Sequence, residues 1–357
     1  MAAAPQAQPP DELAPLKKEL QGHFTDGLVT LVGLGLSAQA GLPTMPELAA
    51  FLRSQMPQRL PDPLKAPWGA IEANLIAGQD IETALKTVDF ESPLLQHITQ
   101  LTSQLIEERE LVVVQRVLGG QQELPFSKLL PSIMFNCTRA PVITSNYDRL
   151  IELATEIAGY GVDTGFCGQD LGEFNPKLSH EALGQATLSM VSRKQLRRTY
   201  RKHVALYKPH GSLDWHEHRD KVIRCHFRID APRLMITPGV SKYRKGYEVP
   251  FDHHRTSANE AIDRAGRFLI VGYGFNDDQL ETHLRTELKR GKPCLLLTKS
   301  LTGNSGRLVA ECPSITAIVS NGPDGGTGSL VLQSGKRTEI PNKNIWDLGV
   351  FVQEILS

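Results

Sequence analysis

The chain has 357 residues, of which 40% are hydrophobic and 22% charged, and its formal net charge at pH 7 is zero. This composition is ordinary for a globular protein, and the lack of net charge excludes a general attraction to nucleic acid or to a membrane surface. No apolar run is long enough to span a bilayer, and the N-terminus lacks the basic and apolar regions of a secretory signal. We therefore expect a cytoplasmic protein, with any nucleic-acid contact made indirectly or through a partner.

The cysteines do not indicate a disulfide framework or a zinc site. No two of them form a C-x-x-C pair, which is the spacing typical of a zinc knuckle. They are Cys137, Cys167, Cys225, Cys294 and Cys312. We expect no bound metal, and reduced cysteines fit a cytoplasmic location.

The first elements lead into a glycine-rich loop. Residues 1–24 are predicted to form a tail and an amphipathic helix, and the apolar run from residue 28 predicts a strand that ends in Gly-Leu-Gly. Thr44 and Glu47 have the spacing of a capping box, so a helix is expected to start there. Residues 68–119 have helical periodicity, and we interpret them as a helical insertion between strands.

The rest of the chain alternates strands with helices. Residues 168–202 are predicted to be a polar, irregular insertion, and the basic run from Arg193 to His203 is either a solvated helix face or a contact for a partner. Asp277 or Asp278 is expected to cap one of the later helices. Strands, with the turns that end them, are expected within residues 141–148, 203–215, 234–239, 267–274, 292–298 and 314–320, and helices within 149–159, 253–266, 275–291 and 344–356.

This alternation predicts an α/β fold, with a Rossmann-like parallel sheet flanked by helices in one domain from residue 25 to residue 357. Sheets of this kind bind ligands at the carboxyl ends of their strands. Polar or glycine-containing motifs stand at four predicted strand ends: VGLGLS at 32–37, ITSNYD at 143–148, YKPHGS at 207–212 and IVGYGFND at 270–277. We expect all four motifs to meet in one cleft.

The glycines of the first and fourth motifs leave two alternatives open. Gly33 and Gly35 let the backbone approach a ligand closely, and Ser37 adds a hydroxyl. N–H groups at the start of the following helix can bind phosphate oxygens. The alternative is a tight turn with no ligand, and the same two alternatives apply to Gly272 and Gly274.

The second and third motifs contain side chains suited to catalysis. The amide of Asn146 offers a donor and an acceptor to a ligand or a water, although asparagine is also common in turns. Asp148 stands where the next helix needs an N-cap, so its position alone favours a structural role. His210 lies in a strand-end turn, and an imidazole is a suitable general base at neutral pH.

Taken in this order, the motifs resemble those of the sirtuin-type NAD-binding domain. The matching stretches are GLGLS at 33–37 with GLP at 41–43, SNYD at 145–148 and PHGS at 209–212. The family pattern is Gly-Ala-Gly-x-Ser with Gly-Ile-Pro, then Gln-Asn-x-Asp, then His-Gly. The later stretch GYGFNDDQLETHL resembles a strand end of the bacterial sirtuin-like branch associated with defence against phage. The resemblance spans about residues 28–300.

Several departures separate this chain from the protein-deacylating sirtuins. Those enzymes have a four-cysteine zinc module after the His-Gly motif, where this chain has Cys225 alone. They continue Gly-Ile-Pro with Asp-Phe-Arg, where this chain has Thr44-Met45-Pro46. Leu34 replaces the small alanine of the first motif. These departures favour the defence branch, whose members cleave NAD itself.

The resemblance implies a role for each motif residue. Asn146 would position the nicotinamide ribose or the attacking water, Asp148 would help to hold the carboxamide, and His210 would act as the base. The dinucleotide would lie against the remaining motif residues, which are Gly33, Gly35, Ser37, Gly41, Gly211, Ser212, Gly272, Tyr273 and Gly274. The implied reaction is hydrolysis of NAD⁺ to nicotinamide and ADP-ribose, with a transition state like that of glycoside cleavage.

The same resemblance implies an effector of anti-phage defence that depletes NAD⁺. As a stand-alone sirtuin-like subunit, the chain is expected to form a homo-oligomer and to pair with a HerA-type ATPase. Two other functions stay open: a non-catalytic subunit that binds NAD or another nucleotide, and an NAD-dependent protein deacylase. Cyclisation and ADP-ribosyl transfer share their first step with hydrolysis, so the sequence does not separate them from it.

Overall fold

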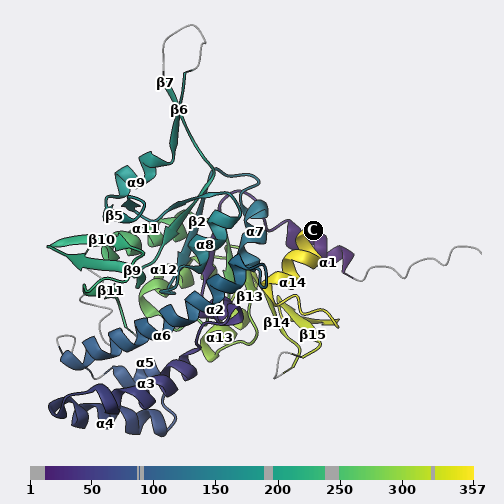
Figure 1. Cartoon of the computed structure of the whole chain (residues 1–357). Helices are drawn as coiled ribbons and strands as arrows, with labels where there is room; N and C mark the ends of the chain where they lie inside the picture. Colours follow the sequence, from purple (N-terminus) through teal and green to yellow (C-terminus); the bar gives the residue numbers. More distant parts are fainter. Residues whose placement is uncertain (1–12, 87, 89–91, 189–195, 238–248, 323–325) are drawn as a thin grey trace, which may run out of the picture.

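A nine-stranded sheet runs through the computed structural model, which describes residues 13–86, 88, 92–188, 196–237, 249–322 and 326–357 (Figure 1). In spatial order its strands are β16 (Lys336–Pro341), β15 (Gly328–Gln333), β14 (Ile315–Ser320), β13 (Cys294–Leu297), β12 (Arg267–Val271), β1 (Leu28–Val32), β2 (Arg139–Thr144), β8 (His203–Tyr207) and β3 (Gly161–Asp163). Neighbouring strands from β14 to β3 are parallel. The strands β15 and β16 extend the sheet as an antiparallel edge.

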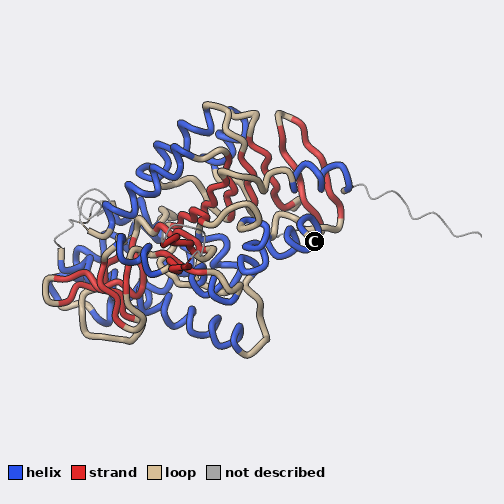
Figure 2. The backbone as a smooth tube through the Cα atoms, turned by 90° about the horizontal axis from the view of Figure 1, so that it is seen from above, coloured by secondary structure: helices blue, strands red, loops and turns tan. Residues whose placement is uncertain are grey.

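Helices cover both faces of this sheet. They are α1 (Ala14–Gln21), α2 (Leu34–Ala40), α7 (Pro125–Ile133), α8 (Leu150–Ile157), α11 (Phe251–Arg264), α12 (Asp278–Lys289), α13 (Gly303–Glu311) and α14 (Leu348–Phe351). In β1, Leu28 and Val32 share a core with α1, α7, α8 and α14, whereas Val29 and Leu31 share a core with α11, α12 and α13. Figure 2 shows helices on both sides of the strands. The predicted class, an α/β fold with a parallel sheet flanked by helices, is confirmed.

The segment between α2 and α7 forms a separate helical layer, at the bottom of Figure 1, with its own core around Trp68. It contains α3 (Met45–Arg59), α4 (Asp62–Ile76), α5 (Ile81–Leu85) and α6 (Pro93–Leu118). The helices of this layer therefore begin earlier than the insertion predicted at 68–119. The predicted capping box at the start of α3 is confirmed, because Glu47 Oε2 accepts a hydrogen bond from Thr44 N at 2.7 Å and Thr44 Oγ1 accepts one from Glu47 N at 3.5 Å.

Residues 168–202, expected to be irregular, contain regular structure. They include β5 (Leu171–Phe174), α9 (Pro176–Ala182), β6 (Gly184–Leu188) and β7 (Leu196–Tyr200). The strand β5 belongs to a second, antiparallel sheet, whose other strands are β4 (Phe166–Cys167), β9 (Gly211–His218), β10 (Lys221–Cys225) and β11 (Arg233–Met235). Local periodicity did not reveal β5, because its main partner β10 comes much later in the chain.

Some predictions fall partly outside the described residues. The N-terminal tail over residues 1–12, residues 193–195 of the basic run and residues 238–239 of an expected strand all lie there. In the described part of the basic run, Leu196–Tyr200 is the strand β7 and His203 begins β8, so the helix considered for this run is wrong. Among the described residues, no helix is both long enough and apolar enough to cross a membrane.

The ends of β1 and β12 are joined through their backbones. Gly33 N donates a hydrogen bond to Val271 O, and Gly35 N donates one to Gly272 O, both at 2.9 Å. A Cβ atom on Gly33 would lie 2.4 Å from Gly272 O, and Gly272 itself has a φ of +61°, where a side chain is strained. The glycines of these two motifs are therefore required for the packing of one loop against the other.

Gly33→Ala is expected to lower the free energy of unfolding by about 2 kcal/mol or more, because the added Cβ overlaps the backbone of the neighbouring loop. Urea denaturation measures this change. Gly303→Ala is the matched control, because a Cβ at the first residue of α13 meets no atom within 4 Å, and its effect should stay within about 0.5 kcal/mol. Equal stabilities of the two variants would contradict the packing argument.

Candidate active site

A cavity of about 680 Å³ lies at the carboxyl ends of β1, β2, β8 and β12. This volume is within the range of ligand pockets, about 300–1,000 Å³. All four strand-end motifs contribute to its lining, among other residues through Leu34, Asn146, His210 and Gly274. The expected convergence of the motifs on one cleft is confirmed.

Asn146 lies just beyond β2 and is 6% exposed. Its Nδ2 donates hydrogen bonds to Gly33 O at 3.0 Å and to Ser37 Oγ at 2.8 Å. Both amide hydrogens are thus used inside the protein, whereas Oδ1 forms no hydrogen bond with the residues that the structure describes. Because Asn146 also lines the cavity, Oδ1 is the atom of this side chain that is available to a ligand or a water.

Asp148 is held from two sides. Its Oδ2 accepts a hydrogen bond from Ser37 Oγ at 2.7 Å, and its Oδ1 accepts one from Leu150 N at 3.1 Å, in the first turn of α8. Arg149 is the N-cap of α8, so the N-cap role predicted for Asp148 is wrong, although its Oδ1 still binds the first N–H group of the helix. Asp148 also lines the cavity, so the structural role does not exclude a role in binding. Ser37 joins Asn146 and Asp148 in one buried network.

His210 follows β8, and its Nε2 lies 2.7 Å from Asp277 Oδ2. The two residues are 8% and 5% exposed. This close approach of a ring nitrogen to a carboxylate favours the imidazole tautomer with its proton on Nε2 and its lone pair on Nδ1. The sequence predicts Asp277 or Asp278 as a helix cap, and the place of Asp277 at the end of the fourth motif is the one signal that connects it with His210.

Buried side chains position Asp277. Glu281 is 1% exposed, accepts a hydrogen bond from Asp277 N at 2.7 Å, and accepts another from Arg285 Nε at 2.7 Å. The hydroxyl of Tyr273 donates to the same carboxylate at 3.3 Å. Burial raises the pKa of Tyr273 well above its ordinary value, so the hydroxyl stays protonated and can remain a donor.

The turn that contains His210 is fixed by its own backbone and by a buried lysine. Gly211 has a φ of +87°, and a Cβ there would lie 2.1 Å from a backbone carbonyl oxygen. Lys208 Nζ donates hydrogen bonds to Ser212 Oγ and to Glu152 Oε1, both at 3.0 Å. Burial raises the pKa of Glu152, and Lys208 opposes this effect. Ser212 is fully buried, so its hydroxyl stabilises the turn.

Glu110 of α6 connects the helical layer to the start of α8. Its Oε1 accepts a hydrogen bond from Arg149 Nε at 2.7 Å, and its Oε2 accepts one from Arg149 N at 2.8 Å. Burial raises the pKa of Glu110 to about 7, while Arg149 lowers it and the nearby Asp148 carboxylate raises it. This ion pair holds α6 beside Asp148.

The helical layer closes the cavity with charged side chains. Asp80, Glu82 and Lys86, from α5 and its flanks, line the cavity. Asp148 and Asp277 also line it, so the described lining has four carboxylates and one ammonium group. Such a lining favours a ligand group that is positively charged or develops positive charge. No local motif indicated that α5 would contribute to the site.

The predicted site residues fall into two groups. Those that line the cavity are Asn146, Asp148, His210, Gly272, Tyr273 and Gly274. The described lining does not include the others, which are Gly33, Gly35, Ser37, Gly41, Gly211 and Ser212. The N–H groups of Gly33 and Gly35 donate within the protein, so these two groups are not available to a phosphate. Gly41 ends α2 with a φ of +114°.

The part of the chain that contains three of the four motifs is similar to a known protein family. Residues 141–299 match the family model of the SIR2-like domain. This SIR2-like segment includes Asn146, His210 and Asp277, whereas the glycine loop after β1 precedes it. The match covers less than half of the chain. No curated protein matches the chain.

Two solved structures have a related arrangement. One is a Sir2 mutant with a p53 peptide and NAD, with 11% identity, a TM-score of 0.43, and coverage of 95% of this chain and 97% of that chain. The other is a complex of a Sir2 homologue with NAD, with 14% identity, a TM-score of 0.42, and coverage of 95% of both chains. At these identities and TM-scores the likeness supports no conclusion about chemistry.

Ser37→Ala is expected to lower the free energy of unfolding by about 1–3 kcal/mol, because Asn146 Nδ2 and Asp148 Oδ2 each lose a buried partner. Urea denaturation measures this change. The control is Ser54→Ala, at an exposed position of α3 where the hydroxyl contacts Phe51 O, with an expected change within about 0.5 kcal/mol. If Ser37→Ala were as stable as its control, the network would not stabilise the fold.

Proposed function

We propose that this chain is an NAD⁺ glycohydrolase that cleaves the nicotinamide–ribose bond to give nicotinamide and ADP-ribose. The observation behind this proposal is that Asn146 and His210 line one cavity from the neighbouring strands β2 and β8, with His210 paired to Asp277. An oriented amide oxygen and a histidine–carboxylate pair are what an attacking water needs. The SIR2-like match includes all three residues.

The reaction uses the positive charge of the nicotinamide ring. The C1′–N bond breaks, and its electron pair goes to the ring nitrogen, so nicotinamide leaves as a neutral molecule. The ribose then has oxocarbenium character, as in glycoside cleavage. Water adds to C1′ and loses one proton, which completes ADP-ribose. The excess of carboxylates in the cavity lining stabilises the positive charge of the ring and of the ribose.

Each side chain has a role that follows from its hydrogen bonds. His210 accepts the proton of the water or of a ribose hydroxyl at Nδ1, because the Asp277 carboxylate beside Nε2 favours a proton on that other nitrogen. Asp277 stabilises the imidazolium that results. Asn146 positions the water or the nicotinamide ribose through Oδ1, since its Nδ2 is already engaged. Asp148 accepts a hydrogen bond from the nicotinamide carboxamide.

The remaining predicted residues serve dinucleotide binding in two ways. Gly272, Tyr273 and Gly274 line the cavity. They form the wall next to the adenosine part of the dinucleotide. Residues behind the wall shape it through their packing and hydrogen bonds: Gly33, Gly35, Ser37, Gly41, Gly211 and Ser212. Lys86 is the lining cation that is suited to the diphosphate. The proposal includes NAD as the substrate and no metal in the reaction.

We further propose that the activity serves anti-phage defence by depleting NAD⁺ in the cytoplasm. The support is the resemblance of GYGFNDDQLETHL to the defence branch of the sirtuin-like family. Unregulated hydrolysis of NAD⁺ would harm the cell itself, so control by assembly is expected. The proposed partners are further copies of this chain and a HerA-type ATPase.

His210→Ala is expected to lower NAD⁺ turnover about 100-fold or more, because it removes the base, and Asn146→Ala is expected to have a similar effect. Chromatography of nicotinamide and ADP-ribose, with the chain alone and with a HerA-type ATPase, measures this turnover. His218→Ala is the control, because His218 is exposed at the end of β9 and should leave turnover unchanged.

One outcome would contradict the role of His210, and two would contradict the function itself. Full turnover by His210→Ala would exclude it as the base. Nicotinamide release that requires an acylated peptide would favour the deacylase. Binding of NAD without turnover, with or without the ATPase, would favour a non-catalytic subunit.

A further inference from the structure

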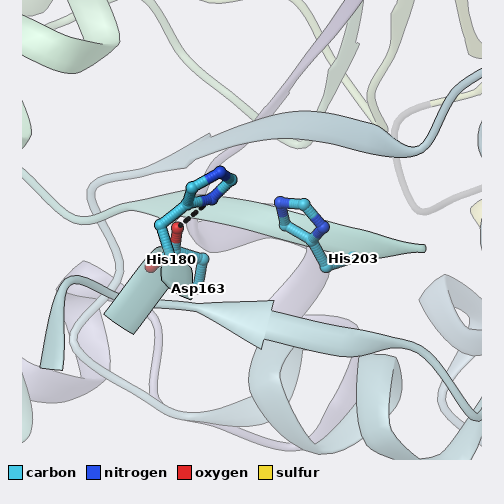
Figure 3. Close-up of side chains that lie close together, drawn as sticks. All are labelled: Asp163, His180 and His203. Atoms are coloured by element: carbon cyan, nitrogen blue, oxygen red, sulfur yellow. Dashed lines mark ion pairs between the residues drawn. The ribbon is translucent and has the colours of Figure 1, made fainter. Parts of the chain in front are cut away.

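A cluster of two histidines and an aspartate lies away from the cavity. Asp163 ends β3, His180 is in α9, and His203 begins β8. One potential ligand atom from each residue lies within 4.8 Å of the other two. Figure 3 shows the three side chains gathered together, with the ring of His203 turned toward His180. The proposed reaction uses none of them.

His203 has a buried nitrogen that lacks a partner. The residue is 1% exposed, and Nδ1 lies 2.9 Å from Arg201 O. A carbonyl oxygen can only accept, so Nδ1 is the protonated nitrogen and the lone pair is on Nε2. No described residue forms a hydrogen bond with Nε2. Metal-binding histidines usually donate their other ring N–H to a carbonyl or a carboxylate, and His203 has this arrangement.

The other two side chains are also oriented for a metal. Asp163 Oδ1 accepts hydrogen bonds from Ser179 Oγ at 2.6 Å and from Gly165 N at 3.2 Å, which leaves Oδ2 facing His180. Oδ2 lies 3.5 Å from His180 Nδ1. Ligand atoms around a tetrahedral Zn²⁺, with bonds of about 2.0–2.1 Å, are roughly 3.3–3.4 Å apart. His180 stacks on Tyr200 at 4.5 Å between ring centroids.

We propose that Asp163, His180 and His203 bind one divalent transition-metal ion, with Zn²⁺ as the ion best suited to two imidazoles and one carboxylate. A water or another solvent ligand completes the tetrahedron on the open side, where the side chain of His180 is 39% exposed. The alternative without a metal is an ion pair between His180 and Asp163, but that pair leaves His203 Nε2 without a partner among the described residues.

This site has a structural role. His203 is at the amino end of β8 and His210 follows its carboxyl end, seven residues later, so their Cα atoms can be separated by roughly 23 Å. The ion would connect α9 to the neighbouring strands β3 and β8 at the edge of the sheet. In the chain, α9 leads into β6 and β7, at the top of Figure 1. Bound Zn²⁺ should therefore stabilise the folded chain.

The test is a calorimetric titration of Zn²⁺ into the untagged, full-length chain after treatment with a chelator. We expect one ion per chain, and a rise in the melting temperature when Zn²⁺ is added. His203→Gln and His180→Ala are each expected to weaken Zn²⁺ binding about 100-fold or more, because each removes a ligand. His180 is half-exposed, so its variant decides the question even if His203→Gln fails to fold.

His218→Ala and Cys167→Ser are the controls, and both should bind Zn²⁺ like the unchanged chain. Co²⁺ serves as a spectroscopic probe, because thiolate ligands add an intense charge-transfer band that nitrogen and oxygen ligands lack. A thiolate band, no Zn²⁺ binding at micromolar concentrations, or equal binding by His180→Ala and the unchanged chain would each overturn the proposal. None of these results depends on turnover of NAD⁺.

Discussion

The backbone contact between the loops after β1 and β12 is the constraint on which the candidate site depends. Gly33 and Gly35 donate hydrogen bonds to the end of β12, and a Cβ on Gly33 would collide with Gly272 O. The contact fixes Gly33 O, which accepts a hydrogen bond from Asn146, and it fixes the loop that brings Asp277 to His210. The glycines at 33 and 35, which are compatible with phosphate binding in the sequence, are thus required for the packing of the two loops.

Much of the fold was predictable because its signals are local. The apolar run of β1, the capping box at Thr44 and Glu47, and the alternation of strands with helices each follow from short stretches of sequence. The convergence of four motifs followed from one general rule, since parallel strands present their carboxyl ends at the same edge of a sheet. Asn146, Asp148 and His210 were found in this way.

The features that sequence reasoning missed depend on long-range contacts. Asp277 contacts His210 although they follow β12 and β8, which are not neighbours in the sheet. Asp80 and Glu82 reach the cavity only because the helical layer folds over it. The strand β5 depends on β10 for its hydrogen bonds. Asp163, His180 and His203 are widely spaced in the sequence. No short motif in the sequence therefore indicated that they could bind a metal together.

The central claim is that NAD⁺ binds with its nicotinamide ribose in the cavity between Asn146 and His210. A crystal structure of the His210→Ala variant with NAD⁺ tests this claim most directly, because the variant should bind NAD⁺ without consuming it. We predict that ribose C1′ lies within about 4 Å of Asn146 Oδ1, close enough for one positioned water. Density for the nicotinamide ribose outside this cavity, or no bound dinucleotide at saturating NAD⁺, would contradict the account.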